Sequence, residues 1–223
     1  MKEIKKYCVC FYKSPSEVKK ALRGNFGDEL SIISTNREHN LDSNEALKSE
    51  NNIYEFSGYL RAMEHMIEND IAVSTIFNDT VLMNRSQFLI GAGSYFLEYA
   101  LSKQPVLIGS LEKGLPGLGS YKGPLSPYFV RSNCFTINRA AAILARDMLI
   151  EFSDKTFDDQ LNSEIEAFTT YRYSHFHHSR KIIAIRLEQE LSRIIYQKGM
   201  IIPIQSLFRF RVLSMLNAFK EKL

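Results

Sequence analysis

Short apolar runs alternate with segments of helical periodicity in the first half of the chain. Three runs rich in β-branched and aromatic residues, at 7–12, 30–34 and 70–77, predict buried β-strands. The segments between them, at 16–22 and 54–69, have helical features. A strand–helix–strand–helix–strand order at this spacing predicts a right-handed, parallel, doubly wound sheet.

Each of these two helices has its own signature. The shorter one begins with Ser14 as a cap, Pro15 at its first position and Glu17 in its first turn, and it ends at Gly24. In the longer one, apolar side chains recur at three- and four-residue steps and form one stripe: Phe56, Tyr59, Leu60, Met63, Met66 and Ile67. Such a stripe is typical of a helix that packs on a core.

Beyond residue 85 the chain continues with the same kinds of element. The pattern predicts strands at 105–109 and 129–137, and helices at 86–101, 140–152 and 182–196. The sheet is therefore expected to be flanked by helices along most of the chain.

Three remaining segments complete the picture. Residues 36–49 are polar and predict a loop. Residues 114–127 contain four glycines and three prolines, a composition that is incompatible with a regular helix or strand, so this segment also predicts a loop. Long loops in compact domains are often functional. Residues 203–223 have an amphipathic helical pattern. We therefore expect a single α/β, Rossmann-like domain at 1–202, with a mostly parallel central sheet flanked by helices, and a C-terminal helical extension at 203–223.

The composition is that of an ordinary globular domain. With 223 residues, 45% of them hydrophobic and 24% charged, the chain is long enough for one substantial core and short for two. The formal net charge of +3, from 28 basic and 25 acidic side chains, is too small an imbalance to indicate a nucleic-acid partner.

The cysteines bear on the cellular compartment. Cys8 and Cys10 share one face of a predicted strand, which favours core packing, and with Cys134 they make an odd count that argues against a disulfide framework. The N-terminal apolar run is too short and too polar for a signal peptide, and no stretch approaches the ~20 apolar residues of a membrane-spanning helix. A cytoplasmic protein is therefore expected.

Asn78, Asp79 and Thr80 are the first candidates for chemistry. They follow a predicted strand directly, so we expect them at the carboxyl end of the sheet, where open α/β sheets bind ligands. A carboxylate between amide and hydroxyl oxygens suits a Mg²⁺ or Mn²⁺ that also touches phosphates. The alternative is an ordinary turn, because Asn and Asp often end strands. On the surface of a cleft, Asp79 would contribute little to stability.

Four segments, taken in order, resemble a known enzyme family. They are 52–63 (NIYEFSGYLRAM), 78–80 (NDT), 127–138 (PYFVRSNCFTIN) and 186–199 (RLEQELSRIIYQKG). Together they are similar to the GT-A glycosyltransferases of bacterial surface-polysaccharide synthesis, closest to the rhamnan synthesis F-like group. That group has a Y-D-F helix start, an N-D-S after the central strand, a P-Y-H-x-x-S-Y-F strand and a late E-x-x-L-S helix. Phe129 stands where this pattern has His. The resemblance covers most of the chain and implies a GT-A-like domain.

The resemblance implies roles on the side of a nucleotide-sugar donor. Tyr12 and Lys13 would lie near the nucleotide base and ribose. Asn78, Asp79 and Thr80 would bind the donor, with Asp79 holding a divalent Mn or Mg ion that bridges the diphosphate. A cation in this position would stabilise the leaving diphosphate.

One departure from the family bears on the metal. The usual GT-A motif has two acids separated by one residue, whereas Asn78 and Thr80 stand at those ends here. With one carboxylate the cation would be weakly held, or its place would be taken by basic side chains such as Lys113, Lys122 or Arg131.

Two glutamates complete the implied site. Glu55, at a helix N-terminus, would lie near the donor, and Glu188 would be the base that activates the acceptor, or would bind the acceptor. Sugar transfer needs one carboxylate to take a hydroxyl proton. Other interpretations stay open: Glu55 can simply favour the helix dipole, and Glu188 can be a solvated acid on a helix face.

The C-terminal segment 203–223 has two interpretations. Its apolar residues lie towards one side, with basic residues around them: Phe208, Val212, Leu213, Met215, Leu216 and Phe219, then Arg209, Arg211, Lys220 and Lys222. A basic amphipathic helix can lie on an anionic membrane, but it can equally pack on its own domain or on a second subunit. A lipid-linked acceptor would favour the inner membrane face.

The leading function is therefore transfer of a sugar from a nucleotide-sugar to a surface-polysaccharide or lipid-linked glycan acceptor. The alternative is a catalytically inactive glycosyltransferase-like module that binds a nucleotide or a glycan, for which Asn78 and Thr80 are the best support. A nucleotidyltransferase is disfavoured, because the chain lacks the Gly/Arg/Lys-rich start that such enzymes use for triphosphates.

Overall fold

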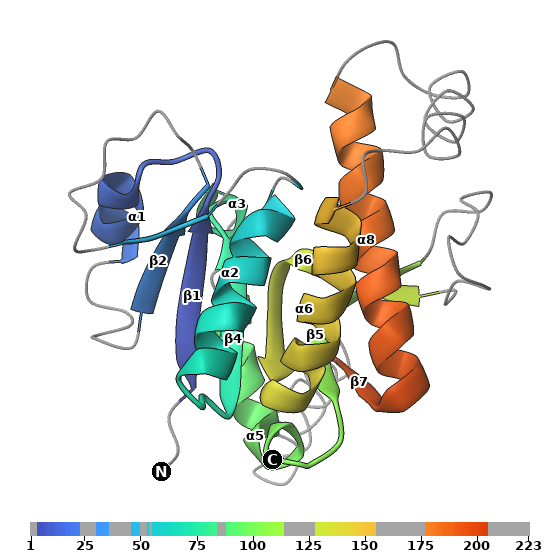
Figure 1. The fold of residues 1–223 in the computed structure, drawn as a ribbon. Helices are drawn as coiled ribbons and strands as arrows, with labels where there is room; N and C mark the ends of the chain where they lie inside the picture. The colour runs from blue at the N-terminus through green and yellow to red at the C-terminus, as the bar shows by residue number, and fades with distance from the viewer. Residues whose placement is uncertain are drawn as a thin grey trace, which may run out of the picture.

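A seven-stranded mixed β-sheet forms the centre of the computed structural model, which describes residues 4–22, 30–35, 46–49, 53, 55–83, 88–113, 128–154 and 177–204 (Figure 1). The strand order is β3-β2-β1-β4-β6-β5-β7. The strands are β1 (Lys5–Cys10), β2 (Leu30–Ser34), β3 (Ala46–Lys48), β4 (Val73–Asn78), β5 (Val106–Lys113), β6 (Tyr128–Asn138) and β7 (Met200–Pro203). β6 runs antiparallel to both of its neighbours, and the other pairs are parallel. The expected mostly parallel sheet is confirmed.

Helices cover both faces of this sheet. They are α1 (Pro15–Leu22), α2 (Glu55–Glu68), α3 (Thr80–Met83), α4 (Phe88–Ala92), η2 (Gly93–Phe96), α5 (Leu97–Ala100), α6 (Arg139–Asp154) and α8 (His177–Lys198). The buried residues of α2, α6 and α8 share one core cluster with one face of the sheet, and those of α1, α3, α4 and α5 share a second cluster with the other face. α2, α6 and α8 lie side by side in front of the strands in Figure 1. The predicted α/β architecture with flanking helices is therefore confirmed.

Successive side chains of β1 point to opposite faces of the sheet and so belong to different core clusters. Tyr7 and Val9 point to the α2 side, whereas Cys8 and Cys10 point to the α1 side. Cys8, Cys10 and Cys134 are free and fully buried. The prediction that Cys8 and Cys10 share a face and pack in the core is confirmed.

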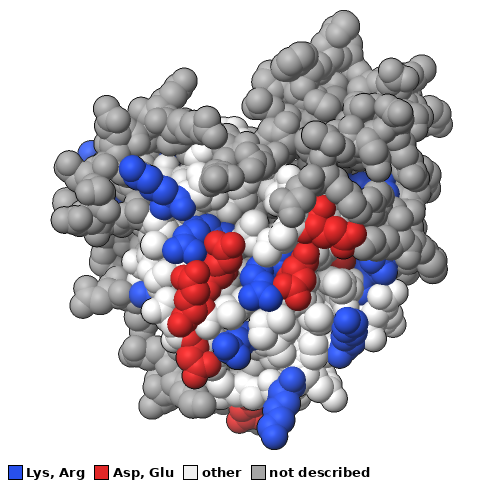
Figure 2. Space-filling view, viewed as in Figure 1, with Lys and Arg blue, Asp and Glu red and all other residues white. Residues whose placement is uncertain are grey.

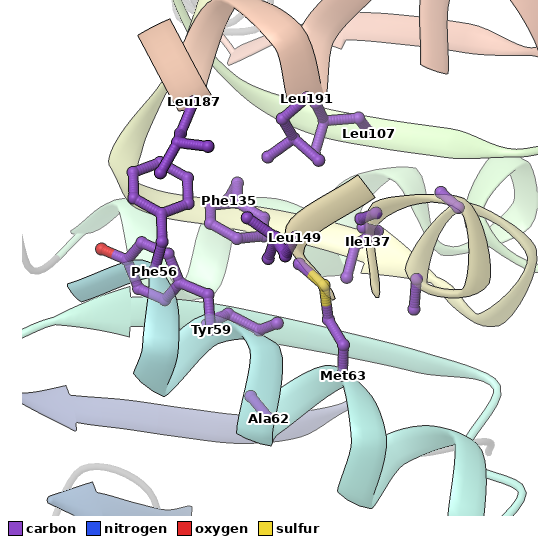
Figure 3. Close-up of a cluster of buried hydrophobic side chains, with 14 of the residues drawn as sticks. Phe56, Tyr59, Ala62, Met63, Leu107, Phe135, Ile137, Leu149, Leu187 and Leu191 are labelled. Atoms are coloured by element: carbon purple, nitrogen blue, oxygen red, sulfur yellow. The ribbon is translucent and has the colours of Figure 1, made fainter. Parts of the chain in front are cut away.

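The predicted stripe of α2 forms the centre of the first cluster (Figure 3). Phe56, Tyr59 and Met63 are fully buried against the sheet. The Tyr59 ring meets Phe56 edge-to-face at 5.1 Å between centroids, and it meets Phe135 of β6 in the same way at 5.4 Å. These two contacts fix the direction of the Tyr59 ring, which matters for the site described below.

On its outer side, α2 carries charged residues of both signs. Arg61 pairs with Glu64 at 3.2 Å and with Glu68 at 3.4 Å. Figure 2 shows acidic and basic side chains interspersed over the face formed by α2 and α6. Exposed pairs of this kind contribute little to stability, typically ~0–1 kcal/mol.

The start of α1 follows its sequence signature. The Ser14 hydroxyl accepts the Glu17 N–H at 3.3 Å, and the Glu17 carboxylate accepts the Ser14 N–H at 2.8 Å. This reciprocal pair is a capping box, with Pro15 at the first helical position. The predicted N-terminus of this helix is confirmed.

The helix expected at 86–101 is confirmed in part: residues 88–100 are helical, but they do not form one regular α-helix. The described part of this segment is divided into α4, η2 and α5, with Gly91 and Gly93 near the first break. A Cβ atom at Gly93 would lie 2.0 Å from the Thr136 hydroxyl oxygen, so the backbone passes directly over β6 there. The close contact between Gly93 and β6 therefore prevents a regular α-helix here, although the sequence has helical periodicity.

Two short strands were not predicted. β3 lies in the segment 36–49, which was expected to be a loop, and β7 ends at Pro203, where the C-terminal helix was expected to begin. Both are edge strands of three or four residues. Residues 205–223 lie outside the described residues. Within the part of the chain that is described, no helix has the length and hydropathy to cross a membrane.

Candidate functional site

The loop that follows β1 is tied to the end of β4 through one carboxylate. Oδ2 of Asp79 accepts three successive backbone N–H groups, from Phe11 at 3.1 Å, Tyr12 at 2.6 Å and Lys13 at 2.5 Å. The Asp79 N–H donates to the Val9 carbonyl at 3.1 Å. The structure thus brings together Tyr12, Lys13 and Asp79, which the sequence assigned to one donor-binding region.

Asp79 is fully buried, so the expectation that it lies on a cleft surface and contributes little to stability is wrong. Burial raises its pKa, and the N–H groups of Lys13, Tyr12 and Phe11 oppose that rise. Three backbone donors converging on one oxygen organise the loop, and the loss of this acceptor would remove one hydrogen bond from each of the three residues. Asp79 therefore has a structural role whatever it binds.

The other oxygen of this carboxylate decides whether a cation fits. Oδ1 of Asp79 is buried and has no hydrogen-bond partner among the described residues. A Mg²⁺ held chiefly by substrate phosphates needs only one or two protein carboxylates, and Oδ1 suits that role. The described residues contain no group of three His, Cys, Asp or Glu side chains at metal-ligand spacing. The cation stays a prediction, with Asp79 as its one candidate carboxylate ligand in the 78–80 segment.

Asn78 and Thr80, on either side of Asp79, form the turn that was the alternative interpretation of the 78–80 segment. The Asn78 side-chain oxygen accepts the Thr80 N–H at 3.2 Å and also contacts the Thr80 hydroxyl. This arrangement starts the short helix α3 at Thr80. Asn78 and Thr80 thus hold the strand end in shape, and Thr80 is the partly exposed member of the segment.

The antiparallel strand β6 delivers a second set of residues to the same edge. Phe77 of β4 pairs with Cys134 of β6, so Ser132 lies alongside the 78–80 segment. The Ser132 N–H donates to Oε1 of Glu188 on α8 at 2.6 Å. The donor-side and acceptor-side residues predicted from distant parts of the sequence therefore meet at one edge of the sheet.

Glu188 is partly buried where α8 meets β6. Burial raises its pKa from 4.5 to about 7, the two hydrogen bonds from Ser132 oppose that rise, and the carboxylates of Glu55 and Glu112 add to it. Glu112 itself is ion-paired with Arg131. A carboxylate that titrates near neutral pH can accept a proton from a substrate hydroxyl and release it again.

Glu190, two residues along α8, belongs to a different contact. Its carboxylate accepts a hydrogen bond from Arg193 at 2.8 Å, and both side chains are largely buried. Nearby, the Ser192 hydroxyl accepts the Val130 N–H at 2.9 Å and fastens α8 to β6. The helix thus presents Glu188, and not Glu190, to Ser132.

Glu55 stands at the first position of α2, as the sequence predicted. Burial raises its pKa, its own backbone N–H opposes that rise, and the nearby Asp79 carboxylate adds to it. Glu55 also acts electrostatically on Glu188. Glu55 is therefore near enough to both Asp79 and Glu188 to interact electrostatically with each.

Sequence reasoning missed Tyr59 and Ser132. Tyr59 was interpreted only as one member of an apolar stripe, yet its buried hydroxyl makes no hydrogen bond of ordinary geometry with the described residues. Asn78 and Ser132 are the polar side chains beside it. A tyrosine in an otherwise apolar stripe is a usable signal, because a buried hydroxyl needs a partner.

The remaining predicted residues contribute less definite information. The Tyr12 side chain is 67% exposed at the rim of the site. Lys122 lies outside the described residues.

A pocket of about 340 Å³ on the outer side of α2 is lined by Ile53, Ser57, Leu60, Arg61, Glu64, Lys48, Ser49 and Ser153. It contains none of the clustered carboxylates, so it is not part of the candidate site.

The site as a whole is an edge where two halves of the chain converge. The β1 loop and the end of β4 come from the first half, and Ser132 and Glu188 come from the second. Comparisons of the sequence with protein-family models and with curated proteins gave no match. A functional proposal for this chain therefore rests on its own residues and their arrangement.

Proposed function

We propose that this chain is a glycosyltransferase that moves a sugar from a nucleotide-sugar donor to a hydroxyl of a surface-polysaccharide or lipid-linked glycan acceptor. The observation that carries the proposal is the position of Glu188. It is a partly buried carboxylate whose pKa is raised to about 7, and it lies across the same sheet edge from the Asp79-anchored loop. A base and a nucleotide site on one edge are what such a reaction needs.

The donor would lie along the β1 loop. Asp79 fixes the backbone of Phe11, Tyr12 and Lys13, so the exposed Tyr12 ring is held at the rim, where it can stack on a nucleotide base. Lys13 brings a positive charge that suits a phosphate. A divalent ion on Oδ1 of Asp79 would stabilise the charge of the leaving diphosphate.

The acceptor would approach from the α8 side. Its attacking hydroxyl would give its proton to the Glu188 carboxylate while its oxygen bonds to the anomeric carbon of the sugar. The bond from that carbon to the diphosphate breaks, and the nucleoside diphosphate leaves with the electron pair. The Ser132 N–H holds Glu188 in place for this proton transfer.

A second candidate is a module that binds a nucleotide or glycan without turnover. It is favoured by the way in which Asn78, Thr80 and Oδ2 of Asp79 are occupied by local hydrogen bonds, which leaves one carboxylate oxygen for a cation. Nucleoside diphosphate binding by calorimetry, with and without Mn²⁺, combined with donor hydrolysis, separates the two. Binding without hydrolysis or transfer under any condition would favour the module.

Location follows from the proposed acceptor. A lipid-linked glycan would place the protein in the cytoplasm at the inner membrane face, with the basic amphipathic segment 203–223 as the predicted contact. Residues 205–223 of that segment lie outside the described residues, so this contact rests on the sequence pattern.

A further inference from the structure

The pocket of about 340 Å³ on the outer side of α2 has the size of a small-molecule binding site. Its lining comes from three separate parts of the chain: the end of β3 with the residue after it, the first half of α2 with Ile53 before it, and the last turn of α6. The proposed transfer reaction uses none of these side chains. A ligand in this pocket would therefore be bound in addition to the donor and the reacting hydroxyl.

The pocket is connected to the candidate site through the first turn of α2. Glu55 lies between two lining residues, Ile53 and Ser57, and the Ser57 hydroxyl accepts the Ile53 N–H at 2.9 Å. On the β3 side, the Ser49 N–H donates to the carbonyl of Ser34, at the end of β2, at 3.1 Å. Both hydrogen bonds involve the backbone, so this end of the pocket has a fixed shape.

The apolar part of the lining comes from two side chains. Ile53 is buried in the core cluster on the α2 side, and Leu60 packs against the same cluster and is partly exposed. An apolar wall of this kind can cover the C–H groups of a ligand and remove them from water.

Hydrogen-bonding side chains form the rest of the lining: Lys48, Arg61, Glu64, Ser49, Ser57 and Ser153. The Arg61 guanidinium contacts Glu64 at 3.2 Å and Glu68 at 3.4 Å, in both cases through Nη1. These two ion pairs leave the N–H groups of Nε and Nη2 for other acceptors. The pocket therefore offers donors and acceptors next to each other.

This combination favours a sugar over a simple anion. A phosphate or carboxylate would be attracted by Lys48 and Arg61 but repelled by the Glu64 carboxylate in the same lining. A sugar unit has hydroxyls that both donate and accept, and it has C–H groups that suit Ile53 and Leu60. Glu64 can accept a hydrogen bond from one sugar hydroxyl while Arg61 donates to its neighbour.

We propose that this pocket is a second glycan-binding site, which holds one sugar unit of the acceptor away from its reacting hydroxyl. The choice of a sugar follows from the lining, and the assignment of that sugar to the acceptor rests on the proposed function. A glycan held here would stay near the transfer site, because the pocket shares the first turn of α2 with Glu55. Holding it would raise the effective concentration of its reacting end.

The test is a ¹H–¹⁵N NMR titration of the whole protein with methyl glycosides of glucose, galactose, N-acetylglucosamine and rhamnose, and with inorganic phosphate. We expect at least one glycoside to bind with a Kd of about 1 mM and to shift the amide signals of the pocket lining. Arg61→Gln removes the guanidinium, and Ser153→Tyr fills the pocket from α6. Each should weaken the binding roughly tenfold or more. Both positions are partly exposed, so both variants should fold, and circular dichroism checks this.

Arg146→Gln is the matched control for Arg61→Gln. Arg146 is also paired with an acid, Asp147 at 2.6 Å, but it does not line the pocket, so its loss should leave glycoside binding unchanged. Glu188→Gln should leave it unchanged too, because the proposed base is not part of the pocket.

Four results would overturn the inference: no glycoside binds, only inorganic phosphate binds, binding survives in both pocket variants, or Glu188→Gln abolishes binding. The titration needs no turnover, so it is independent of the proposed function. Sugar transfer without glycoside binding at the pocket would contradict this inference alone. Glycoside binding at the pocket without transfer would contradict the proposed function alone.

Discussion

Glu188→Gln should make the protein more stable at pH 8 while it lowers the proposed transfer activity. The folded-state pKa of Glu188 is raised from 4.5 to about 7, so the folded protein holds this proton more tightly than the unfolded chain does. The stability that this proton contributes is fully present below the unfolded pKa and is lost as the pH rises through about 7. Above that pH, the wild-type protein maintains a negative charge on this partly buried side chain.

The expected gain in stability of Glu188→Gln follows from the size of the pKa shift of Glu188. A rise from 4.5 to about 7 corresponds to up to about 3 kcal/mol of free energy of unfolding at pH 8, and to less than about 1 kcal/mol at pH 5. Gln keeps the shape and the oxygen that accepts the Ser132 N–H, and it carries no charge. For a chain of this length, the gain at pH 8 corresponds to a rise in Tm of up to roughly 6–12 °C.

The assay is urea unfolding of both proteins at several values between pH 5 and pH 8.5, followed by circular dichroism. Glu190→Gln is the matched control, two residues along the same helix. Its carboxylate is paired with Arg193 at 2.8 Å, so its loss should destabilise the protein by roughly 1–3 kcal/mol at pH 8. A Glu188→Gln protein that is less stable than wild type at pH 8, or whose difference does not depend on pH, would refute the account of a partly buried carboxylate that titrates near neutrality.

Three further predictions test other parts of the structure. Asp79→Ala should cost roughly 1–3 kcal/mol of stability in urea unfolding and abolish nucleoside diphosphate binding, because three loop N–H groups lose their acceptor; unchanged stability would mean that the loop does not depend on this carboxylate. Gly93→Ala should lower stability by roughly 1–3 kcal/mol, since its Cβ would collide with Thr136; Gly91→Ala, where the space is open, is the control and should be neutral or stabilising. Removal of residues 205–223 should weaken sedimentation with anionic vesicles if that segment is interfacial, whereas aggregation of the truncated protein would indicate that it packs on the domain or on a second subunit.

Much of the fold could be predicted from local patterns. β2 was predicted with its observed bounds, and the amphipathic stripe of α2 and the capping signature at Ser14 each identified an element, because these signals are determined within a few residues of sequence. The short edge strands β3 and β7 were missed, since three or four residues carry too little periodicity. The break at Gly93 depends on contact with Thr136, which is 43 positions away and leaves no local trace.

Some residues of the candidate site could be predicted from the sequence, but their arrangement could not. Asp79 and Glu55 could be located at the end of a strand and the start of a helix. Ser132, however, reaches the site because β6 inserts antiparallel between β4 and β5, a pairing that no local pattern specifies. The burial of the Asp79 side chain could not be predicted either, because it depends on how the β1 loop folds over the end of β4.

The most direct test of the central proposal is a transfer assay with a panel of nucleotide-sugars and glycan acceptors, read by release of nucleoside diphosphate and by mass spectrometry of the acceptor. We predict acceptor-dependent turnover with one of the donors, which Glu188→Gln lowers by roughly 10²–10⁴-fold while nucleoside diphosphate affinity stays nearly the same. Turnover should also rise with pH through about 7, because the reaction uses the ionised form of Glu188. Full activity of Glu188→Gln, or a wild-type protein that binds no nucleoside diphosphate at all, would contradict the proposal.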